Sequence, residues 1–157
     1  MDYLGGDLRL ELAFDIRINF KDRWMWGPIH PGGPSHGYTS VLNGVVEGPR
    51  LNGKVVDVSG ADWPVVRTDG VVELAAHYML EADDGAKIYI KNMGYVYGPR
   101  AEGDGLPARP GYFRCTPYFR APDGPHEWLN RTVLVGGGER RPDPAGDYSL
   151  FRYWAVY

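Results

Sequence analysis

The residues best suited to chemistry in this chain include an aspartate beside a tryptophan at a predicted chain corner. Asp62 lies in the sequence GADWP, where Pro64 favours an extended conformation for Trp63. A carboxylate at the mouth of a cavity can act as a base if burial raises its pKa, and Trp63 would then stack on the ligand. The same sequence is also typical of an Asx turn with a packed indole, so both interpretations stay open.

Arg114 is the second candidate for a chemical role, and it lies in a segment where polar and apolar residues alternate. In YFRCTPYF, Tyr112 and Arg114 share a mainly polar face, and Phe113 begins an apolar one. If the polar face points inward, Arg114 could bind a carboxylate or enolate oxygen of a ligand. The alternative is a structural ion pair with Asp62 or Glu73, because buried charges are usually paired within the protein.

Several other side chains could line a small-molecule pocket. Trp128 and Asn130 share a face of EWLNRTVL and would supply an apolar wall and one orienting hydrogen bond. A core asparagine with satisfied hydrogen bonds is the alternative there, and also for Asn92. The remaining candidates for ligand contact are Tyr78, Trp26 and His36. His36 could act as an acid or base from a lid, or be an incidental loop residue.

The clearest element that could position these residues is a hairpin over residues 71–97. Alternation runs up to Asp83-Asp84-Gly85 and resumes directly after it, which predicts two strands around a three-residue loop with Gly85 left-handed. The predicted register places Leu80 opposite Ile88, Tyr78 opposite Ile90 and Glu81 opposite Lys87. One face then mixes Tyr78 and Asn92 with aliphatic residues, which suits either a packed core or a cavity wall.

Further elements follow from alternation and from turn residues. Residues 8–20 alternate as one half-buried strand, with Leu8, Leu10, Leu12, Phe14, Ile16, Ile18 and Phe20 on one face. The Gly/Pro-rich stretch 21–37 predicts an irregular lid or rim. Other expected strands cover residues 38–47, a short segment ending at 58, and residues 112–120, 127–136 and 148–157. Residues 59–70 and 98–111 are expected to be turns and loops.

The strand count predicts the fold. About eight strands joined by hairpin-length connections must hide their edges, and an antiparallel up-and-down β-barrel does this while leaving room for one small ligand. We therefore expect an all-β chain in which residues 1–157 form a single β-barrel domain. A two-sheet sandwich is the alternative.

Composition restricts the class of protein. The net charge of −3 is spread along the 157 residues without a basic run, so nucleic acid and membrane are not expected partners. No apolar run approaches the roughly 20 residues of a membrane span, and the N-terminus does not resemble a signal peptide. A single cysteine, Cys115, fits a cytoplasmic protein. We expect neither a metal nor another cofactor, because no ligand spacing or phosphate-binding glycine loop is present.

A set of short motifs resembles a known family. EGPRLNGKV, SGADWPVVRTDG, DDGAKIYIKNMG, YFRCTPYF and EWLNRTVLVGGG occur in the order and spacing of domain-of-unknown-function 3237, over residues 41–157. The resemblance implies a calycin-type (lipocalin-like) barrel, in agreement with the strand count. It implies no activity, because the family consists of small uncharacterised proteins.

Three functions are compatible with these observations. The first is a cofactor-free enzyme for isomerisation, cyclisation or lyase cleavage of a small aromatic or polyketide-like molecule. Asp62 would be its base, Arg114 its oxyanion stabiliser, and Tyr78, Trp63 and Trp128 its walls. The second is a noncatalytic carrier or sensor for a small hydrophobic ligand. The third is an interaction module with a filled core, forming a homodimer through exposed Tyr and Trp.

Overall fold

The central hairpin has the register that its alternation predicts. In the computed structural model, which describes residues 5–98, 111–141 and 145–157, it consists of β6 (Val72–Ala82) and β7 (Lys87–Tyr97). Leu80 pairs with Ile88, Tyr78 with Ile90 and Glu81 with Lys87. Gly85 has a φ of +87°, a left-handed value that glycine adopts without steric cost.

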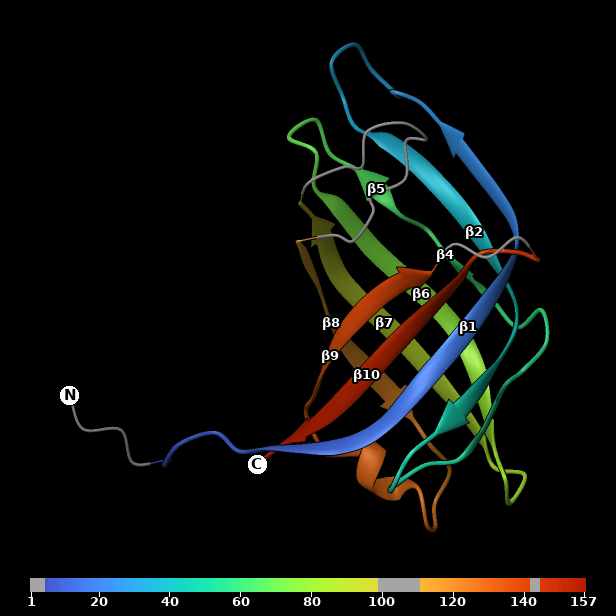
Figure 1. Cartoon of the computed structure of the whole chain (residues 1–157), viewed down its shortest axis with the longest axis vertical. Helices are drawn as coiled ribbons and strands as arrows, with labels where there is room; N and C mark the ends of the chain where they lie inside the picture. The colour runs from blue at the N-terminus through green and yellow to red at the C-terminus, as the bar shows by residue number, and fades with distance from the viewer. Residues whose placement is uncertain (1–4, 99–110, 142–144) are drawn as a thin grey trace.

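The remaining strands complete a closed antiparallel barrel (Figure 1). The long strands are β1 (Leu10–Trp26), β2 (Ser35–Glu47), β8 (Tyr112–Arg120), β9 (Leu134–Arg141) and β10 (Tyr148–Val156). Three short strands, β3 (Gly53–Val55), β4 (Ala61–Asp62) and β5 (Val65–Val66), share the position between β2 and β6. Pairing of β1 with both β2 and β10 closes the sheet, so the predicted barrel is confirmed and the sandwich is not formed.

The Gly/Pro-rich stretch 21–37 is more regular than the sequence predicts. β1 continues to Trp26 and β2 begins at Ser35, so only residues 27–34 remain as a loop. Trp24 pairs with Tyr38 and Trp26 with His36, and the two strands extend beyond the rest of the barrel at the top of Figure 1. The prediction of an irregular lid was wrong because cross-strand aromatic pairs support the ladder close to the glycines and prolines.

The predicted face of the first strand is wrong at its N-terminal end. The register with β10 shifts between Leu12 and Phe14, which is a β-bulge at Ala13. Phe14 is fully buried, whereas Leu10 and Leu12 are 55% and 42% exposed. A single extra residue in the strand therefore turns the leucines outward.

The segment predicted as a strand at 127–136 divides into two elements. Residues Glu127–Asn130 form a short 3-10 helix, η1, and β9 begins only at Leu134. Leu129 of η1 is buried against the core, and Figure 1 shows η1 at the opposite end of the barrel from the β1–β2 extension. The first part of the expected strand is therefore a short helix, which the buried Leu129 holds against the core.

The interior of the barrel has two halves. Around the end that carries η1, the space is filled by a core that includes Phe14, Leu80, Ile88, Ile90 and Phe119. Towards the other end, the inward side chains surround a cavity. Most of the expected loop at 98–111 lies outside the described residues. Within the described segments, no helix has the length and hydropathy needed to cross a membrane.

Candidate functional site

The cavity inside the barrel has a volume of about 250 Å³. Most of its wall is aliphatic or aromatic, from residues such as Ile18, Phe20, Val41, Leu74, Phe113 and Phe151. Its polar lining consists of Arg23, Thr39, Asp62, Tyr78, Asn92, Arg140 and Ser149. An apolar enclosure with a few convergent polar groups is the usual composition of a small-molecule site, although this volume lies below the common range of roughly 300–1,000 Å³.

Asp62 is the carboxylate of this cavity. β4 bridges β2 and β6, with Asp62 opposite Thr39 on one side and Ala76 on the other. The Ala75 N–H donates a hydrogen bond to Asp62 Oδ1 at 2.9 Å. Burial raises the pKa of Asp62 from 3.8 to about 6, against the opposing effects of hydrogen bonds from the Ala75 and Trp63 backbone and of the Arg23 charge.

Two arginines supply positive charge to the same cavity. Arg140 of β9 forms an ion pair with Asp147, and Arg23 Nη1 of β1 lies 3.4 Å from Oδ2 of the same carboxylate. Burial lowers the pKa of Arg23, and the nearby Arg140 charge lowers it further. Arg140 Nε has no hydrogen-bond partner among the described residues. Because the two guanidinium groups share the Asp147 carboxylate, one positive charge remains to balance Asp62 or a bound anion.

Polar side chains also form the floor of the cavity. Asn92 Oδ1 is buried without a hydrogen-bond partner in the described part of the chain, and the buried Tyr78 hydroxyl interacts with that of Tyr153. Burial raises the pKa of Tyr78, and the Asp62 charge acts in the same direction, against the hydrogen bond with Tyr153. Burial raises the pKa of Cys115 to about 11, so its thiol is neutral near pH 7. Unpartnered buried donors and acceptors are costly in an empty site and can be satisfied by a ligand.

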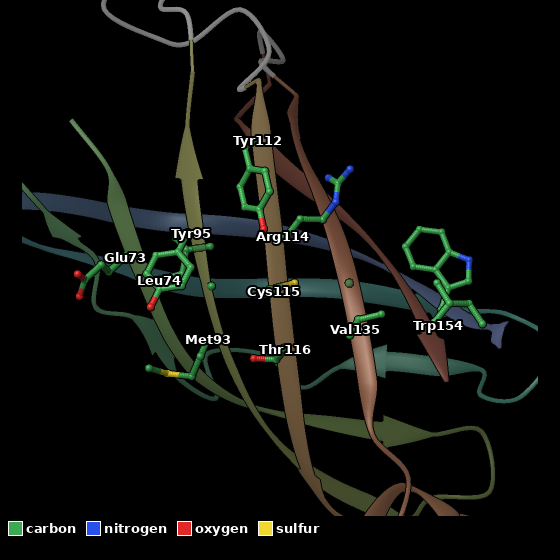
Figure 2. Close-up of a pocket in the computed structure, with 13 residues that line it drawn as sticks. Glu73, Leu74, Met93, Tyr95, Tyr112, Arg114, Cys115, Thr116, Val135 and Trp154 are labelled. Carbon is green, nitrogen blue, oxygen red and sulfur yellow. The ribbon is translucent and has the colours of Figure 1, made fainter. Parts of the chain in front are cut away.

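Arg114 and Tyr112 lie outside the barrel, contrary to the arrangement expected for Arg114. The side chains of β8 alternate, with Phe113 and Cys115 buried inside and with Tyr112 and Arg114 exposed. Figure 2 shows both on the outer face of the sheet, where they line a groove of about 690 Å³ together with Tyr95 and Trp154. Arg114 donates a hydrogen bond to the Phe113 carbonyl at 2.9 Å. It is therefore placed neither with Asp62 nor towards a cavity ligand.

Trp63, Trp26 and His36 also lie on the outer face. Trp63 follows the inward Asp62 and is 51% exposed, with its ring 4.8 Å from that of Tyr38. Trp26 stacks on His36 at a centroid distance of 6.0 Å. These residues form an aromatic surface on the β1–β2 extension and do not line the cavity, because alternation turns them away from its wall.

Trp128 and Asn130 have structural contacts at the far end of the barrel. The Arg50 guanidinium lies 3.7 Å from the centre of the Trp128 ring. Asn130 Nδ2 donates to the Ala121 carbonyl at 2.9 Å, and Asn130 Oδ1 accepts from the Ala121 N–H at 2.7 Å. Both residues therefore stabilise the η1 connection, and the prediction that they share a pocket with Asp62 was wrong.

Of the predicted site residues, the structure brings Asp62, Tyr78 and Asn92 together, and it adds two arginines that the sequence did not indicate. Arg23 falls in the stretch expected to be a loop. Arg140 follows the glycines at 136–138, which resemble a turn in sequence. In β9, continued alternation was the available signal, since it places Arg140 on the inner face with Gly138. In β1 the register with β2 shifts between Phe20 and Arg23, so alternation from Ile18 and Phe20 would have turned Arg23 outward.

The donor set of the cavity favours proton transfer and anion binding. It offers one carboxylate, two guanidinium groups, hydroxyls and an amide. Among the residues that the structure describes, no three His, Cys, Asp or Glu side chains are grouped as potential metal ligands. A carboxylate with a pKa near neutrality and cations within one apolar enclosure can remove a proton and stabilise the resulting oxyanion.

Comparison with known proteins identifies relatives over almost the whole chain. The model of a family described as a protein of unknown function (DUF3237) matches residues 8–156. A UPF0311 protein from Rhodopseudomonas palustris is 36% identical over 142 residues, which are 87% of this chain and 91% of the relative. The crystal structure of that protein, described as of unknown function, superimposes with a TM-score of 0.84 at 29% identity, covering 97% of this chain and 99% of the other.

Two further structures share the architecture. A beta-barrel like protein from Acinetobacter baumannii has a TM-score of 0.82 at 26% identity, covering 99% of this chain and 100% of the other. A protein from Penicillium herquei, described as an enzyme, has a TM-score of 0.72 at 17% identity and covers both chains completely. At that identity the similarity demonstrates a common fold and nothing about activity.

Proposed function

The chain belongs to the DUF3237 family, whose function is unknown, and we propose that it is a cofactor-independent enzyme that uses Asp62 as a base inside the barrel. The substrate would be a small aromatic or polyketide-like molecule held in the cavity. The reaction would be an isomerisation, a cyclisation or a lyase cleavage, because each of these can begin with removal of a proton from a C–H or O–H group.

The observation that carries the proposal is that Asp62, Arg23 and Arg140 line the same apolar cavity. Its pKa of about 6 leaves the carboxyl mostly ionised near pH 7 while keeping it basic enough to accept a proton. When a proton leaves carbon or a phenol, negative charge collects on oxygen. Arg140 and Arg23 line the same cavity and would stabilise that oxygen, which is the role that the sequence suggested for Arg114.

The lining also defines the class of ligand. Phe113 and Phe151 meet edge to face at 5.4 Å and form part of an aromatic wall that would pack on a flat ring. The Tyr78 hydroxyl would donate a hydrogen bond to an oxygen of the ligand, and Asn92 Oδ1 would accept one from a ligand hydroxyl. The favoured substrate is therefore a compact, mostly apolar molecule with a carbonyl or phenol group.

Solvent deuterium exchange tests the proposal without knowledge of the final product. Small aromatic ketones, phenols and lactones are incubated with the protein in D₂O, and binding and loss of the acidic C–H signal are followed by NMR. We expect the wild type to accelerate exchange in a bound compound, and Asp62→Asn to bind it within about threefold but to lose at least 100-fold in exchange rate. Arg114→Gln is the control and should change neither quantity. Equal exchange by Asp62→Asn and wild type would exclude Asp62 as the base.

A noncatalytic carrier or sensor is the second candidate. It is favoured by the unpartnered Asn92 Oδ1, which a bound ligand would satisfy without any proton transfer. Tight binding that needs Tyr78 and Asn92, with no exchange above the uncatalysed rate for any bound compound, would favour this function over the enzyme.

A further inference from the structure

The N-terminal end of β1 is an unpaired sheet edge. On one side it pairs with β10, where the Arg9 N–H donates to the Tyr157 carbonyl at 2.8 Å and the Tyr157 N–H donates back at 2.9 Å. On the other side, pairing with β2 starts only at Asp15, and the Arg50 N–H bonds to the Ala13 carbonyl at 3.1 Å. Within the described ranges, residues 9–12 therefore have a strand partner on one side only, and Leu8 directly precedes them.

The backbone groups of this edge point away from the barrel. In an antiparallel ladder, hydrogen bonding alternates from one residue to the next. Because Arg9 bonds to β10, the N–H and C=O groups of Leu8, Leu10 and Leu12 are directed to the free side. The same three side chains are 72%, 55% and 42% exposed. An apolar edge with free donors and acceptors is a template for another strand.

The sequence of this edge is complementary to itself. Leu8-Arg9-Leu10-Glu11-Leu12 has leucine at every second position and opposite charges on either side of its centre. If two copies pair antiparallel with Leu10 opposite Leu10, Leu8 meets Leu12 and Arg9 meets Glu11 of the other copy. This register also matches the hydrogen-bonding pattern, because the leucines are the residues whose backbone faces outward.

We propose that two copies of this chain form a homodimer by antiparallel pairing of residues 8–12. The pairing would join two barrels through one continuous sheet. Arg9 and Glu11, which form an ion pair within each copy, would also meet Glu11 and Arg9 of the other copy across the two strands. Figure 1 shows the N-terminal arm leaving the barrel wall next to the C-terminus, which gives the edge open access. Leu10 also lines the apolar outer groove of Figure 2, so the dimer contact is continuous with that surface. The inference does not depend on the proposed activity.

Charge exchange tests both the dimer and its register. Sedimentation velocity of the full chain should give a dimer for the wild type. Arg9→Glu and Glu11→Arg each place like charges opposite one another in both symmetric pairs, and each alone should raise the dimer Kd by about tenfold or more. An equimolar mixture of the two variants restores opposite charges in both pairs and should form a heterodimer. Arg120→Glu, an equal charge change on the outer wall, should remain dimeric.

A backbone variant tests the hydrogen bonds. Leu10→Pro removes an N–H that faces the free edge and is not part of the β1–β10 ladder, so the barrel should keep its circular dichroism spectrum while the dimer is lost. A monomeric wild type, a dimer that persists in Leu10→Pro, or a mixture of charge variants that fails to associate would each overturn the proposal.

Discussion

At the scale of single residues, the burial that suits Asp62 to its proposed role as a base has a cost in stability. The enclosure that brings its pKa near neutrality also destabilises its charged form. In the unfolded chain the same carboxyl would ionise with its ordinary pKa. This difference between the folded and unfolded pKa of Asp62 makes the free energy of unfolding depend on pH, and replacing Asp62 should remove that dependence.

Asp62→Asn is expected to stabilise the protein at high pH. The folded-state pKa of about 6 exceeds the unfolded value of 3.8, so folding favours the protonated form. The contribution of Asp62 to stability is therefore fully present below about pH 4 and is lost as the pH rises through about 6. The loss amounts to about 3 kcal/mol at most, and the substitution should raise the free energy of unfolding by about 1–3 kcal/mol at about pH 8. At about pH 3 it should bring no gain.

Urea denaturation at the two pH values measures this effect. Asp57→Asn replaces an exposed aspartate in the turn after β3 and serves as the matched control. An Asp62→Asn variant with the same pH dependence as the wild type would show that Asp62 is not the source of the loss.

The sequence indicated which residue types could form a site more reliably than it indicated which side chains point into the barrel. Asp62, Tyr78 and Asn92 were predicted to line a cavity and do so. Arg114 was placed wrongly because alternation separates two faces of a strand without saying which one points inward. In β8 the apolar face, with Phe113 and Cys115, is the inner one. Burial of the apolar face is the general rule, and Arg114 follows it.

At the scale of elements, β9 shows how glycines shape the cavity wall. A Cβ at Gly138 would lie 2.6 Å from the Phe113 ring, and one at Gly136 would lie 2.7 Å from the Tyr153 ring. Phe113 lines the cavity, so the absence of a side chain at Gly138 determines where that ring lies. The glycines serve the packing of neighbouring strands and do not form a turn.

Gly138→Ala is expected to displace Phe113 and disturb the cavity. Overpacking of this kind commonly costs about 1–3 kcal/mol. The matched control is Gly137→Ala, whose Cβ would point outward and meet its nearest atom, Arg114 Nη1, at 3.5 Å. Thermal unfolding should show a lower midpoint for Gly138→Ala than for Gly137→Ala, and ligand affinity should fall in the first variant alone. Equal unfolding midpoints and equal ligand affinities of the two variants would show that Gly138 does not determine the position of Phe113.

The strands were predicted correctly where the sequences of two neighbouring strands together determine their register. The central hairpin has complementary alternation on both sides of its turn, so its register could be deduced. The extension of β1 and β2 depends on pairing across the loop at 27–34, which the alternation of a single strand does not reveal. The bulge at Ala13 is decided by the register with β10, a contact between the two ends of the chain.

At the scale of the whole molecule, β1 joins the two ends of the sheet, and its buried side chains should dominate the stability of the closed barrel. Phe14 is fully buried and meets the rings of Phe119 and Tyr153 at 5.9 and 5.5 Å. The neighbouring Asp15 forms a bidentate ion pair with Arg152 of β10 at 2.8 and 2.7 Å, but both side chains are largely exposed.

Phe14→Ala should therefore lower the free energy of unfolding by about 3–5 kcal/mol, and Asp15→Asn by less than about 1 kcal/mol. Both can be measured by urea denaturation in the same buffer. A larger effect of Asp15→Asn than of Phe14→Ala would mean that charge pairing, and not packing, holds the barrel closed.

The division of the interior into a filled half and a hollow half has an evolutionary consequence. The packed half near η1 contains much of the buried core, whereas the hollow half contains the polar groups that would meet a ligand under the proposed function. Polar positions of the cavity, which lie outside that core, are thus under weaker selection for stability than the core itself. A barrel with this division can acquire a new substrate by changing its open half while the other half preserves the fold.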